Sequence, residues 1–384
     1  MKIKQRDIPF FIFYGLLIIW RVLLDSEYAG ILNLKAANNL LGIIVILGFF
    51  LQILINKITL KRFFILLFLA ILTVGIAAKS HIFMILLILV ALVSSWNIEF
   101  KKIVKFSYIM CISLLVFVVG SSLLGIIPNN VYNTAYASGN QYCMGFNYFT
   151  AFPSLVLYII IMKMYLNKNI SYVELFSYIF VFAGLYLIAE VTLNLIIGLV
   201  LIIEYLVIVK WKLCNISKRK IYRIALCTAF ILIISIVFMA VNFNANNGLI
   251  AAINRILNNR LFYSYKGISQ YGIHLLGSYI PVTTSVTATS AVEYFYIDIG
   301  YIYYILNFGI IGTITIVGAL LYILYNAAKR KDKIVFIWST IVVIECCIGR
   351  TLDSIWRNPL LFCAIYYICK VFQKKKKRKI KIKI

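Results

Sequence analysis

Charged side chains of an otherwise apolar chain gather in the stretch 242–300 and again near position 350. Guanidinium offers a planar fork of donors that fits phosphate oxygens, and a carboxylate or imidazole can take a proton from a hydroxyl group. The residues of these types in the two stretches are Arg255, Arg260, Lys266, His274, Glu293, Asp298, Arg350, Asp353 and Arg357. They contain no Asp-x-Asp motif and no cluster of histidines and carboxylates, so the sequence predicts neither a metal nor another cofactor.

The composition indicates that these residues are carried by a membrane protein. Of the 384 residues, 63% are hydrophobic and 13% are charged, whereas a soluble domain keeps about a quarter of its residues charged. A helix that crosses roughly 30 Å of hydrocarbon needs about 20 apolar residues. We therefore expect one membrane-embedded domain, residues 1–372, followed by a basic tail, residues 373–384.

The apolar runs predict an all-α polytopic protein with about twelve transmembrane helices. The runs are continuously apolar, whereas the strands of membrane barrels alternate with a period of two. The segments are roughly 8–24, 39–56, 63–78, 82–96, 106–127, 151–167, 174–189, 192–209, 223–241, 301–326, 334–349 and 359–372.

The distribution of positive charge predicts the orientation. Of the 38 lysines and arginines, 30 lie in one alternate set of connections and helix ends, seven lie in the other set, and Arg21 lies within the first predicted helix. Positive connections stay in the cytoplasm. We therefore expect both termini to be cytoplasmic, in a multi-pass protein of the cytoplasmic membrane. The net charge of +26 is accounted for in this way, so nucleic acid is not an expected partner.

The two longest connections fall on the outer side, at about 128–150 and 242–300. Long loops in compact folds are usually functional or disordered, and the second one has enough aromatic and aliphatic residues to form short helices against the membrane surface. Basic residues on a side where positive charge is normally avoided need a reason, and an anionic ligand supplies one. The alternative is that these arginines cap loop helices or reach lipid headgroups.

Short motifs in this region carry a resemblance to a known family. Arg260 opens a segment with a glycine turn at Gly272, residues 298–301 read Asp-Ile-Gly-Tyr, and residues 307–312 read Asn-Phe-Gly-Ile-Ile-Gly. Residues 122–127, Ser-Leu-Leu-Gly-Ile-Ile, and 144–147, Met-Gly-Phe-Asn, add to the pattern. With these motifs the chain resembles the Wzy-type polysaccharide polymerases, relatives of the O-antigen ligases, over roughly residues 75–325.

The resemblance implies glycosyl transfer between two polyprenyl-pyrophosphate-linked oligosaccharides outside the membrane. Arg260 is then expected to stabilise the departing pyrophosphate, and Asp298 to act as the base that removes the proton of the acceptor hydroxyl. Membrane lipids, a flippase and a chain-length regulator are the further partners it implies. The expected substrate-binding residues are Arg255, Lys266, His274, Glu293, Tyr301, Arg350 and Arg357.

The chain also departs from the family, and several alternatives remain open. Relatives commonly carry an arginine where residues 191–194 read Val-Thr-Leu-Asn, and the histidine of the ligases is replaced by Asp298. Asp298 could simply pair with Arg260 or cap the next helix, and His274 could be a packed loop residue. A ligase that transfers the finished glycan is the nearest alternative function. A flippase for lipid-linked oligosaccharides is the alternative from another class, although it should show two related halves.

Overall fold

The computed structural model describes residues 4–56, 60–133, 139–167, 169–213, 219–283 and 294–381, and these are mostly helical. The elements of the first half are η1 (Gln5–Asp7), α1 (Ile8–Leu24), α2 (Tyr28–Ile31), α3 (Leu34–Ile55), α4 (Leu60–Ser80), α5 (Met84–Ser94), α6 (Phe100–Leu123), β1 (Val131–Tyr132), β2 (Gln141–Tyr142) and α7 (Ala151–Leu166). Those of the second half are α8 (Tyr172–Ala189), α9 (Thr192–Tyr205), the π-helical turn η2 (Leu206–Lys210), α10 (Arg219–Val241), α11 (Gly248–Ile256), α12 (Arg260–Tyr271), α13 (Gly300–Lys329), α14 (Lys333–Glu345), η3 (Pro359–Leu361) and α15 (Phe362–Lys381).

The expectation of an all-α membrane protein is confirmed at the level of helices that can span a bilayer. Each of the twelve predicted apolar segments overlaps a helix, with ends that differ by up to nine residues, the largest difference being at α15, which continues to Lys381 in the predicted tail. Among the described residues, seven helical stretches are long and apolar enough to cross a membrane: Gln5–Leu24, Leu34–Ile55, Phe100–Leu123, Tyr172–Ala189, Thr192–Lys210, Arg223–Val241 and Gly300–Lys329. Four further apolar helices are shorter: Phe64–Ser80, Met84–Ser94, Ala151–Leu166 and Pro359–Val371.

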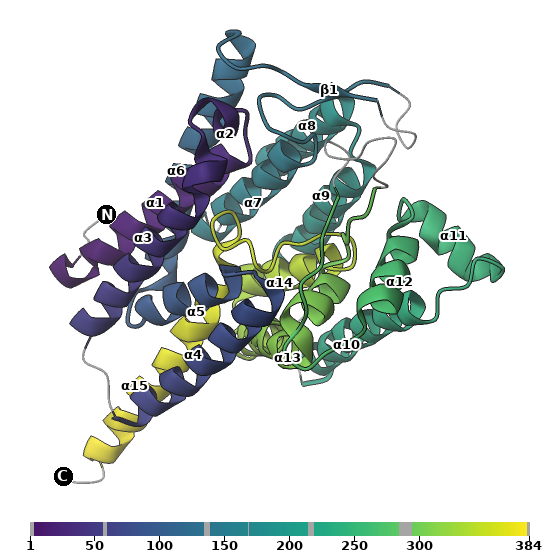
Figure 1. Cartoon of the computed structure of the whole chain (residues 1–384). Coiled ribbons are helices and arrows are strands. Elements are labelled where there is room, and N and C mark those ends of the chain that lie inside the picture. The colour runs from purple at the N-terminus through teal and green to yellow at the C-terminus, as the bar shows by residue number, and fades with distance from the viewer. Residues whose placement is uncertain are drawn as a thin grey trace.

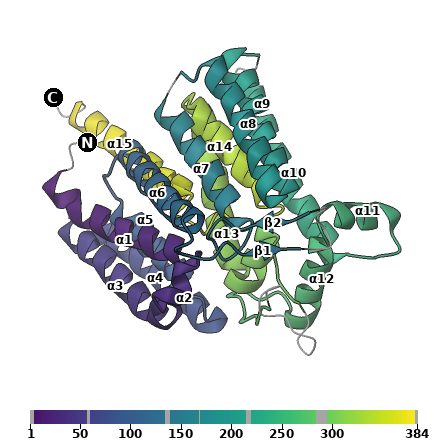
Figure 2. The same ribbon diagram turned by 90° about the horizontal axis from the view of Figure 1, so that it is seen from above.

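The helices form one bundle in which α13 and α14 are central (Figure 1). Helices α1, α3, α4 and α5 pack together on one side, and α7 to α10 lie on the other (Figure 2). Helices α6 and α15 run between them, because α6 contacts α1, α7 and α15 while α15 contacts α13. In the connection between α6 and α7, β1 and β2 pair as an antiparallel ribbon with Val131 opposite Tyr142.

The outside of the bundle is apolar, as expected for a surface that faces lipid. Only 17% of the most apolar part of α10 is buried, and its side chains Phe230, Ile234 and Phe238 are exposed. In water, an exposed apolar patch along a whole helix would favour aggregation. In a bilayer the same side chains contact acyl chains, so this surface supports membrane insertion.

Two helices of the bundle are too short to cross a membrane by themselves. α5 has 11 residues and α14 has 13, which correspond to about 16 Å and about 20 Å of helix, against roughly 30 Å of hydrocarbon. Non-helical chain at membrane depth is tolerated where it is buried in protein or lines a water-filled cavity. The segments that continue from these helices are therefore the first place to look for a functional site.

The non-helical chain that follows α14, residues 346–358, is mostly buried and is held by hydrogen bonds to helices on three sides. The hydroxyl of Tyr14 in α1 donates to the carbonyl of Ile355 at 2.9 Å. The indole nitrogen of Trp338 in α14 donates to the side-chain oxygen of Asn358 at 3.0 Å. Tyr304 of α13 accepts from a backbone N–H of the segment. The segment is thus a fixed part of the core.

A second non-helical segment, residues 272–283, packs against α13 at the point where that helix is broken. At Gly309 the backbone leaves the helical region, with φ 70° and ψ −179°. Such a break leaves the N–H groups of the following half-helix without intrahelical partners. Two of them are satisfied across the gap, because Ile310 donates to the carbonyl of His274 at 3.1 Å and Ile311 donates to that of Leu275 at 3.2 Å. The extended chain therefore replaces a turn of helix.

Two glycines make this joint sterically possible. A Cβ atom at Gly309 would lie 2.3 Å from the backbone nitrogen of Gly277, and one at Gly277 would lie 2.1 Å from the carbonyl oxygen of Asn307. Gly277 also has a positive φ, 79°. Any larger residue at either position would push the extended segment away from α13, and the N–H groups of the half-helix would lose their partners.

We predict that Gly309→Ala destabilises the protein strongly. The left-handed conformation alone costs about 1–3 kcal/mol for a residue with a Cβ, and the clash with Gly277 adds to this. Gly318→Ala in the same helix is the control, since a Cβ there meets nothing within 4 Å and alanine favours a helix interior by about 0.5–1 kcal/mol over glycine. Thermal unfolding of the purified proteins in detergent measures the stability of both variants. Equal melting temperatures for the two variants would contradict the proposed role of the joint.

Candidate functional site

The structure brings Arg260 and Asp298 together. Arg260 is the first residue of α12, Asp298 lies just before α13, and the Nε of Arg260 is 3.5 Å from Oδ2 of Asp298. Both side chains are mostly covered, with 20% and 30% of their surface exposed. Arg260 also donates through Nη1 to the carbonyl of Ile348, on the buried segment after α14. The pair thus joins three parts of the chain that are distant in sequence.

The environment of Asp298 favours its protonated form. Burial raises the pKa of the Asp298 carboxyl above its ordinary value, and the positive charge of Arg260 opposes that rise. The N-cap position of α13 is occupied by Ile299 and not by Asp298. The carboxylate therefore has Arg260 as its charge partner, and the strength of this one contact determines how readily Asp298 takes up a proton.

Local features of α11 and α12 place Arg260 at this point. The side-chain oxygen of Asn254 accepts from the backbone N–H of Phe262 at 3.1 Å, which satisfies one of the free donors at the start of α12. One turn further on, Gly267 lets the helix approach the segment before α13, because a Cβ atom there would lie 2.9 Å from the side chain of Ile297. This close approach carries Arg260 to within reach of Asp298.

Arg350 and Arg357 lie in the buried segment after α14 and contact each other. The guanidinium of Arg350 lies 4.2 Å from the ring centre of Tyr303 and 4.8 Å from that of Tyr296, and it donates to the hydroxyl of Tyr296. Arg357 donates through Nη2 to the carbonyl of Arg350 at 2.9 Å. Stacking on aromatic faces stabilises a partly buried guanidinium without neutralising it.

A third arginine, Arg21 near the end of α1, joins this group. Its guanidinium lies 4.3 Å from the ring centre of Trp356, which is the residue next to Arg357. The Nε atoms of Arg21 and Arg357 are both buried and have no hydrogen-bond partner among the described residues. We call Arg21, Arg350 and Arg357 the arginine cluster.

The arginine cluster keeps its positive charge without a direct ion pair. Within the described part of the chain, no carboxylate oxygen lies within 4.0 Å of these three guanidinium groups. Burial lowers the pKa of Arg350, the charges of Asp353 and Asp25 oppose this, and the neighbouring arginines add to it. Three partly buried guanidinium groups, two of them with an unpaired buried Nε, are suited to bind an oxyanion such as phosphate.

Sequence reasoning did not select Arg21, because the count of basic connections placed it inside the first helix. Asp25 follows Arg21 by one helical turn. A small cavity, about 10 Å³ in volume, is lined by Asp25, Trp356 and Arg357. That volume holds about one water molecule. An arginine followed four residues later by an aspartate, at the outer end of a predicted helix, was the available signal.

The remaining predicted site residues do not join the pair or the cluster. Tyr301 is fully buried and its hydroxyl donates to the carbonyl of Val343 at 2.9 Å, so it packs α13 against α14 and cannot reach a substrate. Arg255 is exposed on α11. His274 is also exposed, with Nε2 2.8 Å from the carbonyl oxygen of Tyr271, so it is not packed in the loop. Lys266 lies 5.9 Å from the ring centre of Phe295. Glu293 falls outside the described residues.

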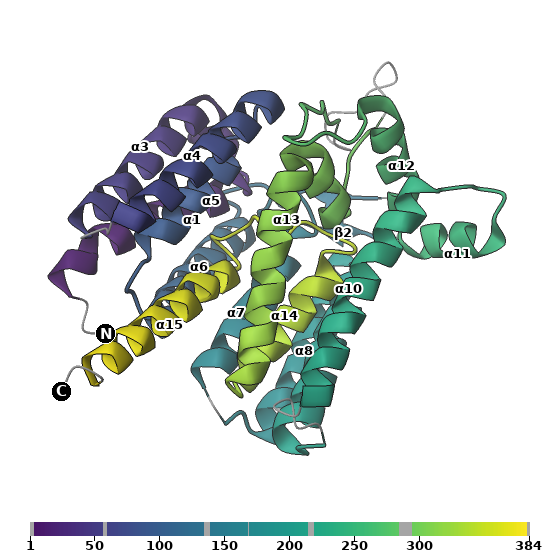
Figure 3. The ribbon, with the colours of Figure 1, turned by 90° about the horizontal axis from the view of Figure 1, so that it is seen from below.

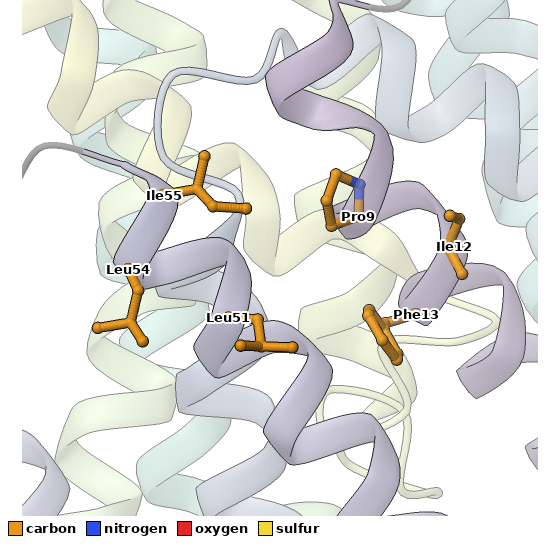
Figure 4. Close-up of a pocket in the computed structure, with 6 residues that line it drawn as sticks. All are labelled: Pro9, Ile12, Phe13, Leu51, Leu54 and Ile55. Atoms are coloured by element: carbon orange, nitrogen blue, oxygen red, sulfur yellow. The ribbon is translucent and has the colours of Figure 1, made fainter.

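A larger hollow lies elsewhere and has a different character. It is a groove of about 570 Å³ between the beginning of α1 and the end of α3, lined by Pro9, Ile12, Phe13, Leu51, Leu54 and Ile55 (Figure 4). None of these side chains can bind an anion or move a proton, and the groove is at the opposite end of α1 from Arg21. Among the described residues, no group of three His, Cys, Asp or Glu side chains is placed to hold a metal ion.

Comparison with protein-family models, with characterised proteins and with solved structures finds no match to this chain. The chemistry of the site must therefore be argued from its own residues.

We predict that Arg260 and Asp298 are energetically coupled in a pH-dependent way. Without Arg260, the pKa of the Asp298 carboxyl rises further, because burial is no longer opposed. The ionised carboxylate then destabilises the folded state most at high pH, where the unfolded chain is fully ionised, and least at low pH, where Asp298 is protonated in both states. Arg260→Met should therefore lose more thermal stability at pH 8 than at pH 5.

The double variant supplies the control. Arg260→Met combined with Asp298→Asn removes both charges and should regain stability over Arg260→Met alone, with a coupling of about 0.5–3 kcal/mol, as is usual for residues in contact. Melting curves of the wild type, both single variants and the double variant complete the cycle. Additive effects with no dependence on pH would contradict the pairing.

Proposed function

We propose that this protein is a polysaccharide polymerase that joins polyprenyl-pyrophosphate-linked oligosaccharide repeat units on the outer face of the cytoplasmic membrane. The proposal includes twelve membrane spans, both termini in the cytoplasm, and residues 242–300 outside. The observation that supports it most is the contact between Arg260 and Asp298 at 3.5 Å. A cation suited to phosphate and a carboxylate with a raised pKa lie side by side and are mostly covered.

The reaction needs two events that these groups can assist. The acceptor hydroxyl oxygen attacks the anomeric carbon of the donor sugar, and the bond from that carbon to the pyrophosphate oxygen breaks. The pyrophosphate leaves with the electron pair, and the acceptor hydroxyl loses its proton. In the proposal Arg260 stabilises the negative charge of the leaving group, and the Asp298 carboxylate accepts the proton.

The pair also offers a way to activate the base. The charge of Arg260 opposes the rise that burial causes in the pKa of the Asp298 carboxyl, which weakens the carboxylate as a base. When the guanidinium turns to a bound diphosphate, that charge is shared, and the proton affinity of Asp298 increases. Donor binding thus prepares the carboxylate for the acceptor, with no group moving further than a side-chain rotation.

The arginine cluster supports the same chemistry. Arg350 and Arg357 were expected to contact the diphosphate, and their neighbour Arg21 adds a third guanidinium with a free buried donor. A diphosphate carries several oxygens, more than a single arginine can bind. In the proposal these arginines hold the anion while Arg260 follows the charge that develops at the leaving oxygen.

We predict that charge removal at the pair stops polymerisation while the protein remains in the membrane. A general base contributes about 10²–10⁴-fold to a rate, so Asp298→Asn should leave single lipid-linked repeat units and no long polymer. Arg260→Ala should give the same phenotype. Lys35→Ala, at an exposed lysine on the same predicted side, is the control and should give normal chain length. Glycan electrophoresis measures the length of the polymer, and immunoblotting measures the amount of protein in the membrane. Normal polymer in Asp298→Asn would remove the base from the mechanism.

Deletion of the gene distinguishes the classes of function. A polymerase mutant should accumulate single repeat units on lipid in the outer leaflet, and a ligase mutant should accumulate finished polymer on lipid. Loss of a flippase strands single units in the inner leaflet. Extraction of lipid-linked glycans, with and without prior enzymatic digestion from outside, identifies the intermediate and its leaflet. Any result other than externally accessible single units would reject the polymerase.

A further inference from the structure

Helix α11 exposes two large apolar side chains and buries a polar one, unlike a helix on a water-soluble surface. Leu249 and Ile256 are spaced i and i+7, so they share one face, and Ile253 beside them is partly buried and packs against the core. Leu249 and Ile256 are 71% and 70% exposed. The buried residue of the helix is the polar Asn254. The helix therefore turns Asn254 to the protein and leaves Leu249 and Ile256 facing outward.

Helix α11 also stands apart from the bundle. It lies beyond the end of α10 and at a steep angle to it (Figure 3), and it projects from the side of the molecule in Figures 1 and 2 as well. It is a well-formed helix, since the side chain of Asn247 caps it by accepting from the backbone N–H groups of Leu249 and Ile250. Among the described residues, no other element covers the side chains of Leu249 and Ile256.

The exposed surface of α11 continues the surface that faces lipid. Six residues separate α11 from α10, whose apolar side chains are exposed along its length. Phe243 in this connection lies 5.9 Å from Phe262 and 6.0 Å from Tyr265, measured between ring centres, and both of these rings are exposed on α12. Aromatic residues gather where hydrocarbon meets headgroups. Arg255 on α11 is exposed as well and can reach phosphate groups of lipids.

We propose that α11 is an interfacial helix that inserts Leu249 and Ile256 into the outer leaflet of the membrane in which the bundle is embedded. Amphipathic helices that lie in the interface bury their apolar face about 5–10 Å into the headgroup and acyl boundary. Arg255, on the opposite flank, then contacts headgroup phosphates. This role replaces the expectation that Arg255 binds the substrate.

The interfacial helix has a direct connection to the candidate site. Asn254 is hydrogen-bonded to Asn259 at 2.9 Å and to the backbone of Phe262 at 3.1 Å, and Arg260 lies between these two residues. The depth at which α11 rests in the leaflet therefore sets the height of Arg260 above the hydrocarbon. The proposal does not depend on the polymerase reaction, and its test has no glycan readout.

Cysteine labelling of the full chain in right-side-out membrane vesicles tests the inference. A charged, membrane-impermeant maleimide should modify Ser269→Cys, which lies on an exposed polar part of α12. It should fail to modify Leu249→Cys and Ile256→Cys until detergent is added. The parent chain, with its native cysteines, sets the background. Labelling of Leu249→Cys in vesicles as fast as that of Ser269→Cys would overturn the proposal.

A second measurement identifies lipid as the covering partner. A bimane dye on Leu249→Cys, in the purified protein in nanodiscs, should be quenched when the lipid acyl chains are brominated. The same dye on Ser269→Cys should not be quenched. Protection in vesicles without quenching in nanodiscs would mean that another protein covers α11, and it would reject the lipid proposal.

Discussion

Every backbone N–H and C=O inside a hydrocarbon layer needs a partner within the protein, and the centre of this bundle is arranged around that constraint. Because α14 is short and α13 is broken at Gly309, two irregular segments must fill the space that helices leave. One supplies carbonyls to the interrupted helix, and the other is held by α1, α13 and α14. Arg350 and Arg357 belong to the second segment. The charged groups are therefore carried by backbone that cannot relax independently of the core.

The charges themselves are compensated in two different ways. Arg260 and Asp298 neutralise each other, so a change in one alters the proton affinity of the other. The arginine cluster has aromatic rings and backbone carbonyls as its neighbours, which lower the cost of burial but leave the positive charge available. An anion bound near these groups would change the electrostatics of both the arginine cluster and the Arg260–Asp298 pair. The cluster gains a counter-ion, and the pair loses part of its internal compensation.

The sequence predicted the helices better than their interruptions. Long apolar runs determine which segments become helices, and each run overlaps one. The break in α13 was not expected within 301–326, because glycine is common in membrane helices and Gly309 shows its effect only where Gly277 packs against it. Arg260 and Asp298 were selected together through the motifs around them. Arg21 was not, since its role depends on Trp356, which is 335 positions away in the chain, and Tyr301 turns inward because α14 covers that face of α13.

The position of Arg260 along the membrane normal connects these observations to the membrane. On one side the guanidinium is bonded to the carbonyl of Ile348, within the rigid irregular core. On the other side its helix begins at the hydrogen bonds of Asn254, which is part of a helix that turns Leu249 and Ile256 outward. A lipid-linked diphosphate is held at the headgroup level by its own polyprenyl tail. Under the two proposals, a cation with one attachment to the core and one to the leaflet surface would meet such a group at a fixed depth, whatever the length of the sugar chain above it.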